Sequence, residues 1–258
     1  MVTSAAELTP TDVIIEIGPG LGMLTKELAR QAGWVITIEL DNKLADILKQ
    51  ELAFFDNVTL INADILKIEP AVLLQEQTVS FPPKTPPFNY KVVANLPYYI
   101  TSNVLRHFLE ASVKPQIMVV MVQKEVAEAI VAEAGEMSLL SVSVQFYGKP
   151  EILNYVPANC FYPAPQVDSA ILRVKLYPRP AVTVTDVKGF FKLVRSGFSA
   201  SRKQIVNSLA QGLGLPKAEV LSLLEKVDIV PQRRAETLTL DEWGQLWLVY
   251  STARNTLC

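Results

Sequence analysis

Short runs of apolar residues recur through the first half of the chain, and each is about as long as one β-strand. These runs occupy residues 13–17, 34–38, 58–61, 91–94 and 117–122. Between them, apolar residues recur three or four positions apart, which is the spacing of a helix that covers one face of a sheet. The helical segments cover residues 23–31, 42–53 and 103–111. The alternation predicts an α/β domain with a parallel sheet.

The pattern is less regular in the middle of the chain. Residues 138–147 alternate like a strand but closely follow a helical segment, so the pattern leaves helix and strand both open. Residues 151–157 and 167–176 are typical of β segments, and we expect them to close the sheet as an antiparallel pair. The four prolines of residues 80–89 predict a solvated loop before the fourth strand.

The last third of the chain has a helical pattern. Apolar residues recur at helical spacing in residues 190–198, 205–213, 217–226 and 240–250. The prolines of residues 177–182 end the last predicted strand and stiffen a short connection. We therefore predict an α/β domain at residues 1–178 and a small all-helical domain at residues 179–258.

The composition fits a folded protein that is not exported. Half of the 258 residues are hydrophobic, which is enough for a sizeable core. The net charge of −2 gives no overall basic field, so a nucleic-acid partner has to be met by a local basic patch. The amino terminus has no signal pattern, and the longest pure apolar run, residues 117–122, is too short to span a bilayer. We expect a cytoplasmic protein with no membrane partner.

Metal binding is not indicated by the cysteines or the histidine. Cys160 and Cys258 show neither metal-ligand spacing nor a disulfide framework, which fits a reducing compartment and inert thiols. His107 lies in a predicted helix with no partner histidine or cysteine at ligand spacing, so we expect a packed or partly exposed side chain. We predict no metal site.

A glycine-rich turn, EIGPGLG at residues 16–22, follows the first predicted strand. Gly18 and Gly20 allow the backbone to turn tightly and approach a ligand, and the next helix offers unpaired N–H groups. The third glycine comes one position too early for a dinucleotide fingerprint, so a hydride-transfer enzyme is disfavoured. The turn favours a nucleoside-bearing cofactor, although a tight turn without a ligand has the same pattern.

Two acidic residues stand at the ends of the next two predicted strands. Glu39 is placed to accept hydrogen bonds from both ribose hydroxyls, and Asp64 from the exocyclic amine of an adenine. Each of them alone is more typical of a helix cap or a solvated surface charge. Together with the glycine turn they place three cofactor-suited groups on one edge of one sheet, which favours S-adenosylmethionine.

The sequence NLPYYITS, residues 95–102, follows the fourth predicted strand. The N6 atom of adenine is a poor nucleophile because its lone pair is delocalised into the ring. The side-chain oxygen of Asn95 and the carbonyl of Leu96 can accept its two hydrogens and favour a pyramidal nitrogen, while Pro97 stiffens the corner. Tyr98 and Phe161 can stack on the two faces of the base.

These residues also have simpler interpretations. Asn95 is a common turn residue, and Tyr98 and Phe161 are compatible with core packing. We expect core packing for Tyr99 and Tyr162. The position of the corner, downstream of the glycine turn and the two acids, favours catalysis.

Six motifs together resemble one family; they are EIGPGLG, NLPYYITS, QKEVAE, FYPAPQVDSA, RSGFSASRKQ and RRAETLTLDEW. From about Asp12 to its end, the chain resembles the KsgA-type ribosomal RNA adenine dimethyltransferases, which are relatives of the Erm resistance methyltransferases. The resemblance implies a Rossmann-like S-adenosylmethionine-dependent methyltransferase domain with a small C-terminal all-helical domain. It also implies transfer of two methyl groups to N6 of each of two adjacent adenosines near the 3′ end of small-subunit (16S) rRNA.

Site residues and partners follow from the motifs and the resemblance. The catalytic set is Asn95, Leu96, Pro97, Tyr98 and Phe161. The cofactor set is Glu16, Gly18, Gly20, Glu39, Leu40, Asp64, Ile65 and Asn95. RNA contact is expected at Lys124, Arg195, Arg202, Lys203, Arg233 and Arg234, although charges on helices are often only solvated faces. We expect a monomer that acts on an immature small ribosomal subunit.

Three features depart from the family pattern. A leader with a Gln-x-Phe-Leu motif is missing, since only eleven residues precede Asp12, so we expect weakened or absent S-adenosylmethionine binding in the chain as written. Before LSV the chain has AGEMS in place of the family's Lys and Tyr-Gly, which alters the expected base-entry loop. Tyr99 stands where many relatives carry Asn, and we assign it no role.

Rival functions remain open. A methyltransferase that acts on DNA adenine or on a protein glutamine amide can use a similar corner. An Erm-type enzyme methylates large-subunit rRNA instead. A non-catalytic assembly factor uses the fold only to hold rRNA.

Overall fold

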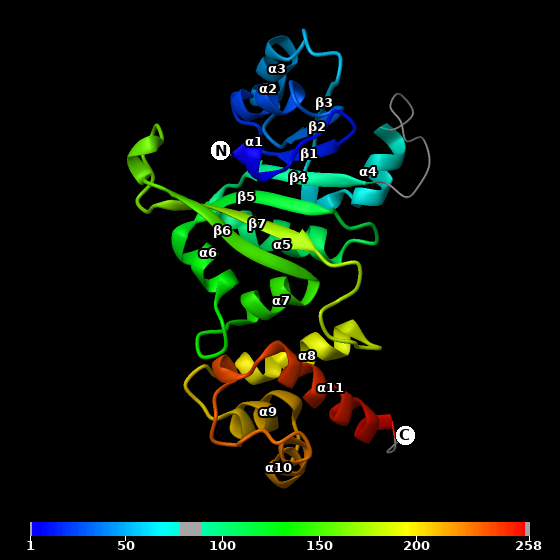
Figure 1. The fold of residues 1–258 in the computed structure, drawn as a ribbon, viewed down its shortest axis with the longest axis vertical. Helices are drawn as coiled ribbons and strands as arrows, with labels where there is room; N and C mark the ends of the chain where they lie inside the picture. The colour runs from blue at the N-terminus through cyan, green and yellow to red at the C-terminus, as the bar shows by residue number, and fades with distance from the viewer. Residues whose placement is uncertain (1, 78–88, 256–258) are drawn as a thin grey trace. The chain divides into compact units, whose positions relative to one another are not determined.

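Residues 2–77 and 89–255 are described by the computed structural model, in which the chain forms two units (Figure 1). The first unit comprises residues 1–127 and 149–177, and the second comprises residues 128–148 and 178–258. The predicted proline-rich loop lies outside the described residues, apart from its last residue, Asn89.

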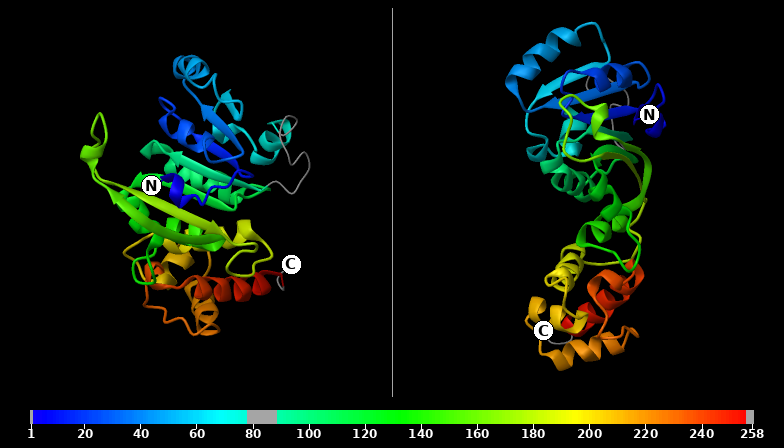
Figure 2. Two further views of the ribbon diagram at one scale, coloured as in Figure 1. Left: turned by 45° about the horizontal axis from the view of Figure 1, so that its top comes forward. Right: turned by 90° about the vertical axis from the view of Figure 1, so that its left-hand side faces the viewer.

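One seven-stranded sheet forms the first unit, with the strand order β3-β2-β1-β4-β5-β7-β6. Figure 2 shows in two further views that the strands lie side by side in a twisted sheet. β1 to β5 are parallel, and β7 is antiparallel to β5. The strands are β1 Val13–Ile17, β2 Trp34–Glu39, β3 Val58–Asn62, β4 Tyr90–Asn95, β5 Ile117–Gln123, β6 Gly148–Val156 and β7 Ser169–Leu176. The predicted α/β class and the closing β segments are confirmed.

The apolar runs form the buried core of this unit. All five residues of β1 are buried, as a parallel strand covered on both faces requires. On one face, Leu28 of helix α2 (Met23–Ala29) packs in a cluster with Ile14 and Val93. The short helix α1 (Val2–Ala5) adds Ala5 to the same cluster.

Four of the parallel strands end one residue later than predicted, and each ends on a polar residue. These residues are Glu39 in β2, Asn62 in β3, Asn95 in β4 and Gln123 in β5. The strand pairing continues past the apolar run, since Glu39 lies opposite Asn62 and Asn95 lies opposite Met121. The carboxyl edge of the sheet therefore carries the polar side chains from which a site can be built.

Helices α2, α3 and α5 correspond to the predicted helical segments, whereas α1 and α4 were not predicted. The remaining helices of the sheet region are α3 Asn42–Glu51, α4 Pro70–Gln77, α5 Thr101–Glu110 and α6 Lys124–Val131, and α6 begins in the first unit and ends in the second. Three 3-10 turns, η1 Ile65–Lys67, η2 Tyr98–Ile100 and η3 Ala158–Cys160, lie in the loops. The pattern missed α4 because its apolar residues are adjacent in sequence and do not recur at helical spacing.

Residues 138–147, for which helix and strand were both open, form helix α7 (Leu139–Tyr147). Ser138 caps this helix, because its Oγ accepts a hydrogen bond from the Ser141 backbone N–H at 3.2 Å. In return, the Ser138 backbone N–H donates to the Ser141 Oγ at 2.6 Å. This reciprocal cap fixes the helix start and decides between the two patterns.

The second unit is helical and has an aromatic core. Phe146 of α7 stacks on Phe190, with ring centroids 5.1 Å apart. Trp243 is fully buried against Gly197, where a Cβ atom would come within 2.3 Å of the indole. The remaining elements are α8 Val187–Phe198, α9 Ile205–Leu213, α10 Lys217–Glu225, η4 Ala235–Thr237 and α11 Leu240–Asn255. The predicted C-terminal helical region is confirmed.

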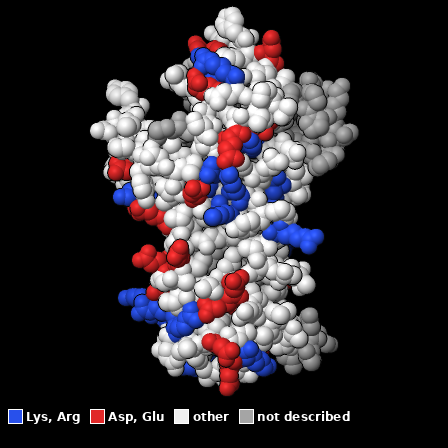
Figure 3. All heavy atoms as spheres, in the orientation of Figure 1, with Lys and Arg blue, Asp and Glu red and all other residues white. Residues whose placement is uncertain are grey.

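Charges of both signs are mixed on the face shown in Figure 3. Opposite charges also form ion pairs: Arg173 lies 3.0 Å from Glu7 and 2.8 Å from Glu151. Among the described helices, none combines the length and hydrophobicity needed to cross a membrane.

Candidate active site

The site lies where the strand order reverses, between β1 and β4. Loops that leave the two strands here diverge, and ligands of open α/β sheets bind in the resulting crevice. The glycine turn follows β1, and Gly18, Gly20 and Gly22 all adopt positive φ, which favours glycine. A Cβ atom at Gly18 would come within 3.9 Å of Pro97 Cδ. The glycine turn and the NLPYYITS corner are therefore close neighbours.

The first pocket lies beside the glycine turn and has a volume of about 220 Å³. Its lining residues are Ile17, Gly18, Ile38, Glu39, Leu40, Ala63, Asp64, Ile65, Leu66, Pro97, Tyr99 and Ile100. Five predicted cofactor residues are brought together here, namely Gly18, Glu39, Leu40, Asp64 and Ile65. They come from the ends of three neighbouring strands, as the sequence predicted.

The two acids of this pocket differ in how their carboxylate oxygens are paired. Glu39 Oε1 accepts a hydrogen bond from the Asp41 backbone N–H at 2.8 Å, and its Oε2 has no such bond within the described residues. Asp64 Oδ1 accepts from the Leu66 backbone N–H at 3.1 Å and caps η1. Asp64 Oδ2 lies 3.7 Å from Lys67 Nζ, which is a loose, exposed pair. Asp64 is thus both a helix cap and a pocket residue.

The residues of the first pocket fit S-adenosylmethionine. Carboxylate oxygens at Glu39 and Asp64 suit the hydroxyl and amine donors of an adenosine. Leu40 and Ile65 offer apolar surface for the ring between these acceptors.

Three predicted cofactor residues, Glu16, Gly20 and Asn95, do not line this pocket. Glu16 is only 1% exposed, and Thr25 donates a hydrogen bond to its Oε2 at 2.6 Å. Burial raises the pKa of Glu16 to about 7, against the effect of the Thr25 hydrogen bond. Direct cofactor contact by Glu16, Gly20 and Asn95 stays a prediction.

The second pocket lies at the NLPYYITS corner and has a volume of about 270 Å³. Its lining residues are Asn95, Leu96, Pro97, Tyr98, Phe161, Pro163 and Pro165. All five predicted catalytic residues are therefore gathered around one space. Pro97 lines both pockets, so the two spaces meet at this residue.

Backbone and side-chain contacts hold the corner against the neighbouring strands. The Leu96 backbone N–H donates to the Met121 carbonyl at 3.2 Å, and the Leu96 side chain is buried. The Tyr98 hydroxyl lies 2.9 Å from Ser169 Oγ. Asn95 is exposed, and its side-chain amide makes no hydrogen bond with the described residues, so it is available to a ligand.

Two tyrosines do not have the core positions expected from the sequence. Tyr99 is 84% exposed and lines the first pocket, because the turn η2 directs it away from the sheet. Tyr162 is fully exposed in the loop that follows η3. Core packing was the wrong prediction for both, since a tyrosine in a loop at the sheet edge has no second layer to pack against.

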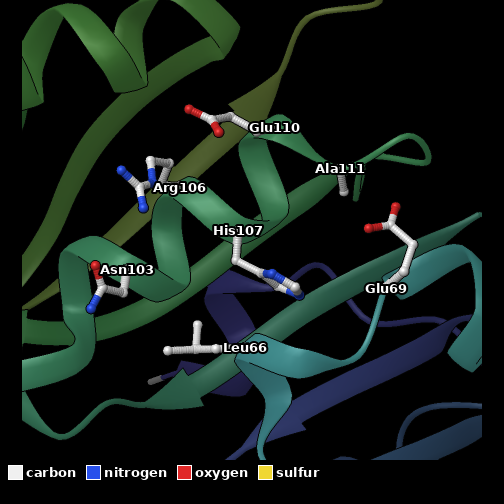
Figure 4. Close-up of a pocket in the computed structure, with 7 residues that line it drawn as sticks. All are labelled: Leu66, Glu69, Asn103, Arg106, His107, Glu110 and Ala111. Carbon is white, nitrogen blue, oxygen red and sulfur yellow. The ribbon is translucent and has the colours of Figure 1, made fainter.

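A third pocket, of about 450 Å³, lies between α5 and the segment that links η1 to α4 (Figure 4). Its lining residues are Leu66, Glu69, Asn103, Arg106, His107, Glu110 and Ala111. Two polar residues of this pocket already have hydrogen-bond partners within the protein: His107 Nε2 lies 2.9 Å from the Ile68 carbonyl, and Ser112 donates to Glu69. Hydrogen bonds from Ser112 lower the pKa of Glu69. His107 is partly exposed, as predicted.

The predicted RNA-contact residues differ in how free they are. Arg195 and Arg202 are exposed. Exposed Arg234 lies 3.7 Å from Glu236, and exposed Lys203 donates to Gln211 at 2.9 Å. Lys124 lies over the Tyr155 ring, 5.5 Å from its centroid.

Arg233 is held within the second unit. Its guanidinium donates to both carboxylate oxygens of Glu242 and to Thr237. These hydrogen bonds lower the pKa of Glu242. Few Arg233 donors are left for a phosphate.

Comparisons with known proteins identify the family of the chain. The family model described as Ribosomal RNA adenine dimethylase matches residues 1–247. A protein of Dehalococcoides mccartyi named Ribosomal RNA small subunit methyltransferase A is 51% identical over 247 residues, which cover 96% of this chain and 81% of that protein.

Two solved structures resemble the whole chain. The 23S rRNA methyltransferase ErmE is 28% identical, with a TM-score of 0.73 over 97% of this chain and 95% of its own. A dimethyladenosine transferase from Plasmodium falciparum shares the fold, with a TM-score of 0.78 at 24% identity over 97% of this chain and 94% of its own. Because the family model and the 51% identical relative both span nearly all of the sequence, the chain belongs to the ribosomal RNA adenine dimethylase family.

Proposed function

We propose that the chain dimethylates N6 of two adjacent adenosines near the 3′ end of small-subunit rRNA in an immature ribosomal subunit. One observation carries the proposal: a cofactor-suited pocket and an aromatic pocket meet at Pro97, beside the free amide of Asn95. Methyl transfer to a base needs this adjacency, because donor and acceptor must come into contact.

The first pocket holds the cofactor. S-adenosylmethionine, when bound, supplies a methyl group on a positively charged sulfur. The free oxygen of Glu39 accepts from the ribose hydroxyls, and Asp64 accepts from the adenine amine. Gly18 has no side chain and lets the ligand approach the turn next to Pro97.

The second pocket holds and activates the target adenine. The Asn95 side-chain oxygen and the Leu96 carbonyl accept hydrogen bonds from the two N6–H groups. These bonds favour a pyramidal nitrogen whose lone pair is no longer delocalised into the ring. Tyr98 and Phe161 supply aromatic surface for the base, a contact worth about 1–3 kcal/mol per base. After the first transfer, one acceptor still holds the remaining hydrogen, so the same corner serves the second methylation.

The second unit provides the phosphate contacts. We assign these contacts to Arg195, Arg202, Lys203 and Arg234, with Lys124 in the first unit. Arg233 is left out because its guanidinium is paired with Glu242.

Small-subunit rRNA is favoured over the Erm-type alternative by sequence. The relative named for the small subunit is 51% identical, whereas the 23S rRNA enzyme ErmE is 28% identical. We further propose that one copy of the chain acts alone, in the cytoplasm.

The test is methylation of purified substrates by the purified protein. Small subunits that lack the modification, large subunits, naked rRNA and DNA each receive S-adenosylmethionine, and mass spectrometry counts N6,N6-dimethyladenosine in each. We expect two adjacent dimethyladenosines in small-subunit rRNA only. Modification of large-subunit rRNA or DNA would overturn the substrate assignment. If the protein binds small subunits but methylates none of these substrates, the result would favour a non-catalytic assembly factor.

A further inference from the structure

Two consecutive residues outside both pockets form hydrogen bonds with Tyr98 and with the loop that carries Phe161. Ser169 is the first residue of β7 and pairs with Gln123 of β5, and Asp168 directly precedes it. Ser169 is fully buried and is absent from the pocket lining. Any effect of this serine on a bound base therefore has to pass through another residue.

Ser169 reaches Tyr98 through its hydroxyl. The two hydroxyl oxygens are 2.9 Å apart, which is hydrogen-bond distance. This contact is at the tip of the ring, so it restricts both side-chain torsions of Tyr98. The backbone of the same corner is fixed separately by the Leu96 N–H bond to the Met121 carbonyl. The ring and the backbone of the corner thus have independent anchors on the sheet.

Asp168 fixes the loop that carries Phe161. Its Oδ1 accepts a hydrogen bond from the Ala158 backbone N–H at 2.9 Å, at the first residue of η3. The Phe161 backbone N–H in turn donates to the Ala158 carbonyl at 3.2 Å. The Asp168 backbone is itself held, because its carbonyl accepts from the Lys124 N–H at 3.0 Å.

We propose that Asp168 and Ser169 are positioning residues that set the two aromatic walls around the target base. The proposal rests on the proposed function of the second pocket. Adjacent residues of one strand thereby fix the separation of Tyr98 and Phe161, which come from distant parts of the sequence. A base that stacks between two walls needs this separation to be fixed before it enters.

The test is a double-mutant cycle on methyl transfer to small ribosomal subunits. Ser169→Ala and Tyr98→Phe each remove one half of the same hydrogen bond, while Tyr98→Phe keeps the ring. We expect each single variant to lower kcat/KM about five- to tenfold, and the double variant to be no worse than either single one.

Asp168 is tested by its two substitutions. Asp168→Asn keeps an oxygen acceptor for the Ala158 N–H and should stay close to wild type. Asp168→Ala removes the acceptor and should lower kcat/KM about five- to tenfold. Ser208→Ala is the matched control, because this buried serine lines neither pocket.

Two further readouts separate positioning from general damage. S-adenosylmethionine affinity should be unchanged in all variants, since Tyr98 and Phe161 do not line the first pocket. Additive losses in Ser169→Ala/Tyr98→Phe, or wild-type activity of Ser169→Ala and Asp168→Ala, would overturn the inference. If Tyr98→Ala also keeps full activity, the result rejects the proposed function of the second pocket, on which the positioning role rests.

Discussion

Pro97 lines both pockets, and the residues on either side of it line different pockets. Asn95 and Leu96 line the second pocket, while Tyr99 lines the first pocket. Six consecutive residues, Asn95–Ile100, thus line the two pockets. Under the proposed function, this explains why so many special residue types occur at one strand end.

Glu39→Gln tests the ribose contact. The amide oxygen can still accept from the Asp41 N–H, but the charged acceptor for the hydroxyls is lost. We expect S-adenosylmethionine affinity to fall about ten- to hundredfold, because hydrogen bonds to charged groups contribute about 1.5–3 kcal/mol. Isothermal titration calorimetry measures the affinity, with exposed Asp46→Asn as control. Equal affinities for Glu39→Gln and wild type would remove Glu39 from the site.

Glu16→Gln tests the buried carboxyl below the glycine turn. Burial raises its pKa to about 7 from an ordinary value of 4.5, so between these pH values the folded protein keeps a proton that the unfolded chain has lost. Its contribution to stability is therefore complete below about pH 4.5 and is lost as the pH rises through about 7.

The size of the effect follows from the pKa difference. We expect wild type to lose about 3 kcal/mol of unfolding free energy relative to Glu16→Gln across this range. Urea unfolding of both proteins at a series of pH values measures the difference. Parallel pH curves for the two proteins would show that Glu16 titrates normally in the folded state.

The sequence could predict that the NLPYYITS corner forms a pocket but not every residue that lines the pockets. Glu39, Asp64 and Asn95 are polar residues at the ends of apolar runs, and that contrast is visible without a structure. Tyr99 is not distinguishable in this way from the neighbouring Tyr98. The two rings separate only because the turn η2 directs them into different pockets.

At the scale of elements, the strands were predictable because their apolar runs have strand length and end in polar residues. Helix α4 was not, since its apolar residues are adjacent and carry no helical spacing. For α7, spacing alone could not choose between helix and strand, and the Ser138 cap decides it.

Gly197→Ala tests the contact between α8 and α11. Alanine favours a helix over glycine by about 1 kcal/mol, but its Cβ atom would lie 2.3 Å from the buried Trp243 indole. Overpacking costs about 1–3 kcal/mol, and the rigid indole has no room to move, so we expect net destabilisation of about 1–2 kcal/mol. Urea unfolding monitored by tryptophan fluorescence measures this change in the free energy of unfolding. A more stable Gly197→Ala variant would show that α11 can shift.

At the scale of the whole molecule, the proposed function divides chemistry and RNA contact between the two units. The first unit contains both pockets, and the second carries most of the exposed basic residues that we assign to phosphate contact. The net charge of −2 gave no sign of this division, because acidic residues elsewhere compensate the basic ones.

Arg202→Ala/Lys203→Ala tests the RNA contact. Each phosphate contact adds about 0.7–0.9 to the slope of log affinity against log salt concentration. The double variant should therefore reduce the slope by about 1.4–1.8 for an rRNA fragment. Lys217→Ala/Lys226→Ala, which removes two exposed lysines near the ends of α10, should leave the slope unchanged. The same slope in wild type and Arg202→Ala/Lys203→Ala would exclude these residues from the RNA interface.

The most direct test of the account is single-turnover methyl transfer by Asn95→Ala on undermethylated small subunits, with dimethyladenosine counted by mass spectrometry. We predict a rate at least about 100-fold below wild type, because an acceptor for the N6 hydrogens is lost. Asn95 was predicted for both the cofactor set and the catalytic set but lines only the second pocket, so S-adenosylmethionine binding should persist. Gln31→Ala, which removes an exposed amide that lines neither pocket, serves as the control. Dimethyladenosine formed by Asn95→Ala at the wild-type rate would contradict the account.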